Sequence, residues 1–120
     1  MGLRWTLPGE PQAAGMARAL VAEALAVSSL ADDAVLVTSE LVTNAVKHGS
    51  GPVDLELQVR PTGVQVTVTS SSASGEPVAR AASTTASGGR GLAIIAALGH
   101  EWGWRRDGDR MSVWADLSEP

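Results

Sequence analysis

The sequence predicts an α/β two-layer sandwich, in which a mixed, mostly antiparallel sheet carries helices packed on one face. Two segments alternate strictly between apolar and polar residues on either side of a glycine-containing turn, which is the pattern of a β-hairpin. Other segments space their apolar residues three and four positions apart, as amphipathic helices do. Because strands that are neighbours in the chain pair with each other, the helices have to share one face of the sheet.

The first quarter of the chain is expected to hold one strand and one helix. Residues 3–7 alternate between apolar and polar side chains, and Pro8-Gly9 ends this strand, which we place at an edge of the sheet. Residues 12–29 are rich in alanine and repeat their apolar residues with helical spacing. The order of elements therefore begins with a strand and a helix.

The second helix has the clearest end signals. Asp32 and Asp33 supply capping and first-turn acids, because carboxylates accept hydrogen bonds from free N–H groups and favour the positive end of a helix. Gly49 suits the left-handed conformation that commonly ends a helix. We therefore expect a helix from the two aspartates up to this glycine.

Two hairpins follow. Their strands and turns are expected at 53–59, 61–63 and 64–68 for the first, and at 102–106, 107–109 and 111–117 for the second. The chain has no Phe or Tyr, so Trp102, Trp104 and Trp114 are expected to fill the core, although alternation could expose one of them. An exposed tryptophan on an edge strand would instead mark a surface for a partner, and Trp5 has the same ambiguity.

A connection of unusual length joins the hairpins. Residues 70–88 are rich in Ser, Ala, Thr and Gly and are too long for an ordinary loop in a small domain, so we interpret them as a lid. The glycine run 88–91 then leads into a helix over residues 92–98, which Gly99 closes.

Composition indicates a single domain spanning residues 1–120, and it excludes several functions. The net charge of −4, with both signs interspersed, argues against a nucleic-acid partner. No apolar run could cross a membrane and no signal peptide is evident, so we expect a cytoplasmic protein. The absence of cysteine excludes disulfides and cysteine metal sites. His100 has no second His or Cys beside it, so we interpret it as a turn or surface residue.

One stripe of the second helix is the main candidate for chemistry. At about 100° per residue, four polar residues share the side opposite the apolar residues: Glu40, Asn44, Lys47 and His48. A carboxylate can accept a proton, an amide oxygen can coordinate a hard divalent cation, and the two basic groups could neutralise phosphates. The alternatives are a solvated helix face and, for His48, a capping role at the negative helix end.

The glycine run before the third helix is the second candidate. Glycines let backbone N–H groups approach an anion, and the N-terminus of the following helix favours negative charge, so residues 88–91 could hold a phosphate. Arg90 could add a charged clamp. Taken alone, such a run is more often a flexible loop before a helix, but the acid–amide helix and the long connection favour the phosphate site.

Together these motifs resemble the Bergerat-type (GHKL) ATPases, the superfamily of histidine kinase catalytic domains, gyrase-type topoisomerases and heat-shock chaperones. The order of elements and the length are most similar to the small bacterial anti-sigma factor serine kinases. Residues 40–48 resemble the N-box of that family, and residues 89–92 resemble its second glycine box. The resemblance covers nearly the whole chain and is most specific over residues 33–45.

The resemblance implies a role for each matching residue. Glu40 would be the general base and Asn44 the Mg²⁺ ligand, with Lys47 and His48 lining the nucleotide side. The phosphate-binding turn would consist of Gly89, Arg90, Gly91 and Leu92. ATP would lie between the helix and the lid, and its γ-phosphoryl group would pass to a serine of an antagonist protein.

The chain departs from the family pattern after the strand 64–68. The pattern has an Asp that accepts a hydrogen bond from the adenine amino group, whereas residues 69–72 are all Ser or Thr and no acid occurs between Glu56 and Glu76. Ser70 could hold adenine directly or through water, but a neutral hydroxyl binds more weakly than a carboxylate, by roughly 1–2 kcal/mol. We therefore expect weakened or altered nucleotide binding.

Two main functions and one weaker alternative are consistent with these observations. The first is an ATP-binding regulator resembling an anti-sigma factor serine/threonine-protein kinase, which would control bacterial transcription through a sigma factor or an anti-anti-sigma antagonist. A homodimer is expected from the same resemblance. The second is a partner-binding pseudo-ATPase of the same fold that has lost productive ATP use. A third, weaker interpretation is a detached catalytic domain that serves a separate sensor.

Overall fold

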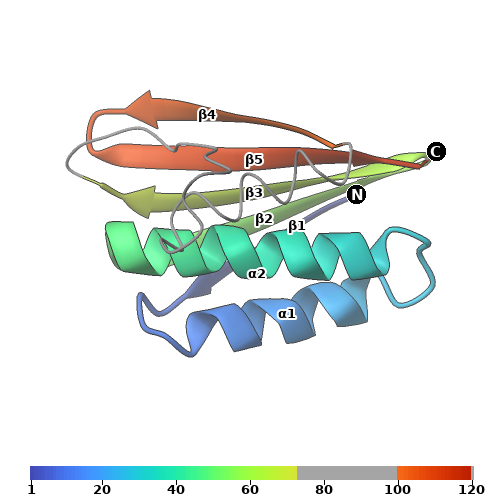
Figure 1. Ribbon diagram of the computed structural model, residues 1–120, viewed down its shortest axis with the longest axis horizontal. Coiled ribbons are helices and arrows are strands. Elements are labelled where there is room, and N and C mark those ends of the chain that lie inside the picture. Colours follow the sequence, from blue (N-terminus) through green and yellow to red (C-terminus); the bar gives the residue numbers. More distant parts are fainter. Residues whose placement is uncertain (73–99, 120) are drawn as a thin grey trace, which may run out of the picture.

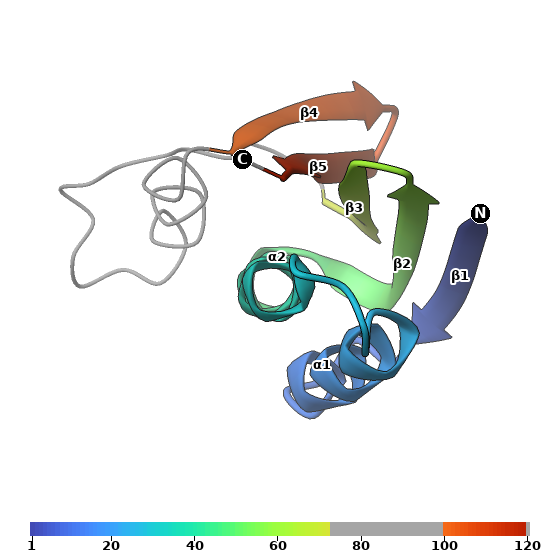
Figure 2. The ribbon, with the colours of Figure 1, turned by 90° about the vertical axis from the view of Figure 1, so that its right-hand side faces the viewer.

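The computed structural model describes residues 1–72 and 100–119 of the chain. This part folds into two layers, a sheet and a pair of helices that cover one of its faces (Figure 1, Figure 2). In chain order the elements are β1 (Gly2–Leu7), α1 (Ala13–Ala24), α2 (Ala31–His48), β2 (Ser50–Arg60), β3 (Gly63–Ser71), β4 (Glu101–Asp107) and β5 (Arg110–Ser118). The predicted α/β two-layer sandwich is confirmed.

The five strands form one sheet in the order β1-β2-β3-β5-β4. Every neighbouring pair is antiparallel, so the described sheet has no parallel pair. Both predicted hairpins are confirmed, with two-residue turns between Arg60 and Gly63 and between Asp107 and Arg110. Gly108 in the second turn has a φ of 64°, which glycine adopts without strain. β1 occupies one edge, as predicted, and β4 occupies the other.

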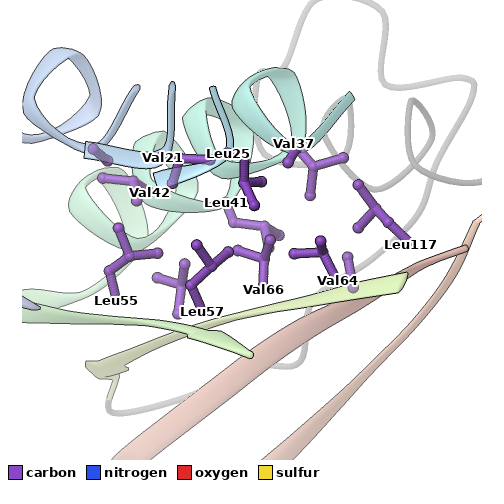
Figure 3. Packing of buried hydrophobic residues seen from close by; sticks show 14 of the residues in the cluster. Val21, Leu25, Val37, Leu41, Val42, Leu55, Leu57, Val64, Val66 and Leu117 are labelled. Carbon is purple, nitrogen blue, oxygen red and sulfur yellow. The ribbon is translucent and has the colours of Figure 1, made fainter. Parts of the chain in front are cut away.

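The core lies between the helices and the inward face of the sheet (Figure 3). Because side chains alternate along a strand, β2 and β3 bury the apolar positions that the sequence pattern identified. One inward row crosses the sheet through Leu57, Val66 and Ala115, all of them completely buried. The buried cluster contains only Ala, Val and Leu, so the layers are held together by aliphatic side chains.

The prediction that tryptophans fill the core is wrong. Trp5 and Trp102 are half-buried and pack against the margin of the core cluster, while Trp104 is 38% exposed. Trp114 faces away from the helices, because its chain neighbour Ala115 is fully buried and strand residues alternate between the two faces. The helices contact mainly the three central strands, so side chains on an edge strand have little to cover them.

Both helices differ at their ends from the sequence expectation. α1 ends at Ala24 rather than Ser29. The N–H of the C-cap Leu25 still bonds to the carbonyl of Val21, and the N–H of Ser28 then turns back to the carbonyl of Leu25 at 2.9 Å. The N-cap of α2 is Leu30, which forms no side-chain cap, so neither Asp32 nor Asp33 caps this helix, and both lie in its first turn. Their charges still favour the positive helix end.

Gly49 ends α2 in extended rather than left-handed geometry, with φ −110° and ψ −168°, so that prediction was wrong. A Cβ at this position would lie 2.7 Å from the carbonyl oxygens of Ala45 and Ser71. Glycine is therefore required here by the close approach of the helix end to β3, and not by a positive φ.

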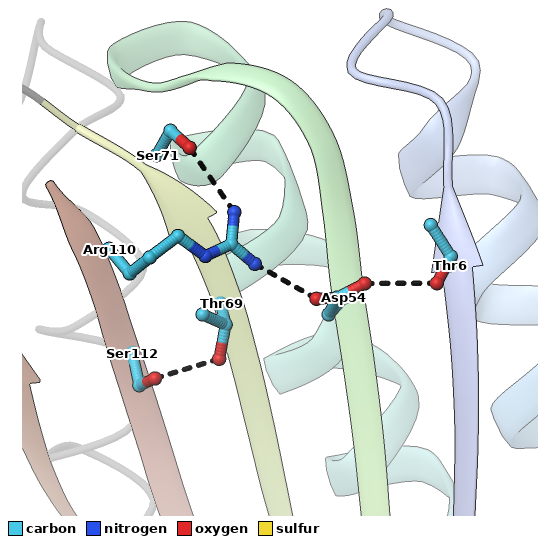
Figure 4. Close-up of polar contacts among 6 residues, drawn as sticks. All are labelled: Thr6, Asp54, Thr69, Ser71, Arg110 and Ser112. Atoms are coloured by element: carbon cyan, nitrogen blue, oxygen red, sulfur yellow. Dashed lines mark hydrogen bonds and ion pairs between the residues drawn. The ribbon is translucent and has the colours of Figure 1, made fainter. Parts of the chain in front are cut away.

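The outward face of the sheet carries no helix among the described residues and is held by polar contacts (Figure 4). Thr6 donates to Oδ1 of Asp54 at 2.9 Å, and Nη2 of Arg110 lies 2.9 Å from Oδ2 of the same carboxylate. Arg110 also donates to the hydroxyl of Ser71 at 3.2 Å. These contacts link β1, β2, β3 and β5 side by side.

Several sequence expectations fall outside the described residues. They are the expected helix over 92–98 and most of the expected lid, residues 73–88. The first residues of that expected connection, 70 and 71, belong to β3, which is longer than predicted. None of the described helices is long and apolar enough to span a membrane.

Trp114 covers Gly103 on the outward face. The two residues lie directly opposite each other on β5 and β4, and a Cβ built on Gly103 would lie 2.2 Å from Cζ2 of Trp114. The indole therefore occupies the space that a side chain would need. An aromatic ring that covers a glycine across an edge strand stabilises the pairing.

Gly103→Ala is expected to destabilise the fold by about 1–3 kcal/mol, because the added methyl group overlaps the indole and displaces it. Gly15→Ala in α1 is the control: its Cβ comes no closer than 3.5 Å to Arg18, and alanine in a helix should stabilise by about 0.5–1 kcal/mol. Urea unfolding followed by tryptophan fluorescence measures both changes. This account would be contradicted if Gly103→Ala lowered the free energy of unfolding as much in a Trp114→Ala background as in the unsubstituted chain.

Candidate functional site

α2 places its four polar residues at the margin between its buried side and solvent. Glu40 and Asn44 are half-buried, whereas Lys47 and His48 are exposed at the end of the helix. The buried side consists of Ala34, Val37, Thr38, Leu41 and Val42. The acid and the amide are therefore the protected part of the predicted stripe, and the basic residues form its open end.

The side-chain oxygen Oδ1 of Asn44 is buried and has no hydrogen-bond partner among residues 1–72 and 100–119. An unpaired buried acceptor costs about 1–3 kcal/mol, so such an atom indicates a ligand, an ordered water or a functional constraint. Oγ1 of Thr38 is also unpaired, but it lies on the core side of the helix. Of these two unpaired oxygens in the described part of the chain, the one of Asn44 therefore lies at the margin of the fold.

An amide oxygen is a suitable ligand for a hard cation such as Mg²⁺, and Glu40 lies one helical turn before Asn44. The described residues contain no cluster of three or more His, Cys, Asp or Glu that could hold a metal ion by themselves. Mg²⁺ commonly keeps several waters and binds through one or two protein oxygens together with phosphate groups. The residues present therefore fit a cation that arrives with a phosphate ligand.

Ser70 lies near the end of β3, next to the end of α2. Its side chain faces the helix layer, continuing the inward alternation of Val66 and Val68, and the residue is 6% exposed. A Cβ built on Gly49 would lie 3.0 Å from Oγ of Ser70. The structure therefore brings this hydroxyl to the backbone of Gly49, although the two residues lie 21 positions apart in the sequence, with β2 between them.

The predicted phosphate-binding turn, Gly89, Arg90, Gly91 and Leu92, lies outside the described residues. Ser72, just before that part of the chain, is held by the β4–β5 hairpin. The N–H of Ser72 donates to the carbonyl of Asp109 at 2.6 Å, and the guanidinium of Arg106 donates to the carbonyl oxygen of Ser72 at 2.6 Å. The role of the glycine run stays a prediction.

His100 is a residue that sequence reasoning misjudged. Its side chain is only 8% exposed, and its Nε2 lies 2.9 Å from Oδ2 of Asp33. The surface role predicted for His100 is therefore wrong: just before β4, its side chain is mostly buried and pairs with Asp33 in the first turn of α2. No signal in the sequence could have found the pair, since 67 positions separate its members.

A five-stranded antiparallel sheet, covered on one face by an acid–amide helix, places this chain in the class of GHKL-type α/β sandwiches. Residues 7–117 match the sequence model of the histidine kinase-like ATPase domain, and the chain belongs to that family.

Among solved structures the chain is similar to the histidine kinase domain of the blue-light activated histidine kinase EL346 from Erythrobacter litoralis, with a TM-score of 0.58 and 18% identity. The comparison covers 92% of this chain and 61% of that one, so this chain spans about three fifths of the length of the other. At this level of identity the likeness concerns the fold. No curated protein matches the chain.

Proposed function

We propose that this chain binds Mg²⁺–ATP beside α2 and regulates a protein partner, in the manner of an anti-sigma factor serine kinase. The observation that carries the proposal is the buried, unpaired Oδ1 of Asn44, one helical turn after Glu40. Membership of the histidine kinase-like ATPase family supports it, because the equivalent helix carries the metal ligand in the ATPases that the sequence resembles.

In this proposal each residue of the stripe has a chemical role. Asn44 contributes one oxygen to Mg²⁺, and the other ligands are phosphate and water. Glu40 would accept the proton of a serine hydroxyl on the partner protein while the serine oxygen bonds to the γ-phosphorus of ATP. The bond from this phosphorus to the bridging oxygen would break, and ADP would leave. Lys47 and His48, at the exposed end of α2, provide basic groups near the phosphates.

A partner-binding protein of the same fold with weak ATP binding is the second candidate, and Ser70 favours it. This residue stands at the end of β3 in place of the acid that the resemblance calls for. Its buried hydroxyl can donate or accept a hydrogen bond but carries no charge, so it holds a base less tightly than a carboxylate. A sigma factor or an antagonist of the anti-anti-sigma type is the proposed partner in both cases.

Mg²⁺–ATP is expected to raise the melting temperature of the chain. A ligand at a hundred times its dissociation constant stabilises by about 2.7 kcal/mol, which corresponds to roughly 10 °C for a domain of this size. Asn44→Ala should abolish most of this shift, whereas Gln58→Ala, on the outward face of the sheet, should retain it. Thermal unfolding with and without millimolar Mg²⁺–ATP measures the difference.

The unfolding measurements without nucleotide serve as the stability control. Without nucleotide, Asn44→Ala should cost little stability, because Oδ1 makes no hydrogen bond to any described residue that the substitution would remove. Absence of any shift in the unsubstituted chain at millimolar Mg²⁺–ATP would refute the nucleotide proposal.

Ser70→Asp is expected to tighten Mg²⁺–ATP binding by about tenfold, since a charge-assisted hydrogen bond replaces a neutral one. The buried carboxylate should also lower the stability of the nucleotide-free chain, so calorimetric titration well below the melting temperature is the suitable measurement. Ser71→Asp is the matched control, because Ser71 points to the outward face and contacts Arg110. An equal gain in affinity for Mg²⁺–ATP in both variants would show that the added charge, and not the position of Ser70, causes the tighter binding.

Transfer of labelled phosphate separates the two candidate functions. If the chain is a kinase, incubation with labelled ATP and a candidate antagonist should label a serine of that antagonist, and Glu40→Ala should lower the rate by about 10²–10⁴-fold. Binding of the antagonist without labelling would favour the partner-binding alternative. Labelling that is unchanged in Glu40→Ala would contradict the role of this carboxylate.

A further inference from the structure

β2 and β3 present one polar side chain to the helix layer. Over residues 53–59 of β2 and 64–68 of β3, every inward position is occupied by Val or Leu. The next inward position of β3 is Ser70, which is 6% exposed. Asp54 and Glu56, the acids of these strands, occupy outward positions, because side chains alternate between the two faces. On these two described stretches, the hydroxyl of Ser70 is therefore the polar side-chain group that can meet a ligand on the inward face.

The strand partners of Ser70 extend its row across the sheet. Ser70 lies opposite Met111 of β5, and Met111 lies opposite Arg106 of β4. The preceding row is apolar and consists of Val68, Val113 and Trp104. Met111 and Val113 are half-buried and Trp104 is 38% exposed. These apolar side chains leave surface on which one face of a flat ring can lie, with Ser70 at the edge of that surface.

The end of α2 connects this surface with the proposed metal and phosphate site. A Cβ built on Gly49 would lie 3.0 Å from Oγ of Ser70. Gly49 follows Asn44 by five residues, which is about 7.5 Å along a helix axis. Figure 1 shows the end of α2 and the end of β3 on the same side of the molecule. A nucleotide whose phosphates lie beside Asn44 can therefore bring its base to Ser70.

We propose that Ser70 makes this site accept 6-oxopurine nucleotides as well as adenine nucleotides, so that Mg²⁺–ITP and Mg²⁺–GTP bind about as tightly as Mg²⁺–ATP. This inference rests on the proposed function, because it concerns the base of the same bound nucleotide. The 6-amino group of adenine donates a hydrogen bond, whereas the 6-oxo group of guanine and hypoxanthine accepts one. The two kinds of purine therefore require opposite hydrogen-bonding behaviour from the protein.

A hydroxyl group meets both requirements. By rotating about its C–O bond it can accept a hydrogen bond from the amino group of adenine or donate one to the oxo group of guanine. An ionised carboxylate has no proton to donate, so it binds the amino group and repels the oxo group. The described inward positions of β2 and β3 carry no carboxylate. The element that would reject a 6-oxopurine is thus missing from this face.

Calorimetric titration with ATP and inosine triphosphate (ITP), each with Mg²⁺, tests the proposal. ITP is the matched probe, because it lacks the 2-amino group of guanine and differs from ATP only at positions 1 and 6 of the ring. The two dissociation constants should agree within about threefold, since each base forms one neutral hydrogen bond with the hydroxyl. GTP should bind as ITP does.

Two negative outcomes of this titration have different meanings. If ATP binds and ITP binds more than about tenfold more weakly, the inference is overturned while the proposed function stands. If neither nucleotide binds, the proposed function is refuted and the inference falls with it.

Substitutions at position 70 test whether this hydroxyl reads the base. Ser70→Asp should tighten ATP binding and weaken ITP binding, so that the ratio of their dissociation constants changes by about 10²-fold. Ser71→Asp is the matched control, because Ser71 contacts Arg110 on the outward face, and its ratio should stay near one. Ser70→Ala should weaken both nucleotides by about fivefold, the value of one neutral hydrogen bond.

The alanine variant decides the question by itself if Ser70→Asp does not fold. A loss of affinity for ATP alone in Ser70→Ala would show that the hydroxyl only accepts, and no loss for either nucleotide would show that it does not contact the base. Either result, or a folded Ser70→Asp variant with an unchanged ratio, would overturn the inference.

Discussion

The packing of α2 across β2, β3 and β5 is the contact on which the rest of the molecule depends. The inner side of this helix meets a sheet surface built mainly from aliphatic side chains, most of which are almost completely buried. Burial of apolar surface contributes roughly 25 cal/mol per Å², so this layer is the main source of stability. It also fixes the rotation of α2 about its axis, because rotating the helix by one residue, about 100°, would place polar side chains in the core.

This rotation decides what the candidate site contains. With Leu41 and Val42 buried, Glu40 and Asn44 fall at the edge of the helix–sheet contact, where they are partly shielded from water. The close approach of Gly49 to β3 then brings Ser70 to the end of the same helix. An unpaired amide oxygen and a buried hydroxyl are thereby held at the margin of a rigid aliphatic layer, and such a layer is a suitable support for a preorganised binding site.

The two faces of the sheet are stabilised in different ways. The inward face packs against helices, whereas the outward face relies on cross-strand pairs such as Arg110 with Asp54 and Trp114 over Gly103. Half-exposed ion pairs of this kind contribute little individually, so the outward face mainly maintains strand register. The two edge strands differ as well, since β4 carries several charged residues and β1 carries only Arg4.

For the described residues, the sequence by itself determined the order and type of the elements though not all of their ends, both hairpins, the position of β1 at an edge and the stripe on α2, because alternation and helical spacing are local patterns. Only the tertiary structure decided that Trp114 faces outward, that Gly49 is required by a close contact, that His100 meets Asp33 and that Oδ1 of Asn44 has no partner. Each of these depends on which segments distant in the chain become neighbours. Local sequence patterns carry no information about such contacts, because packing between the layers selects them.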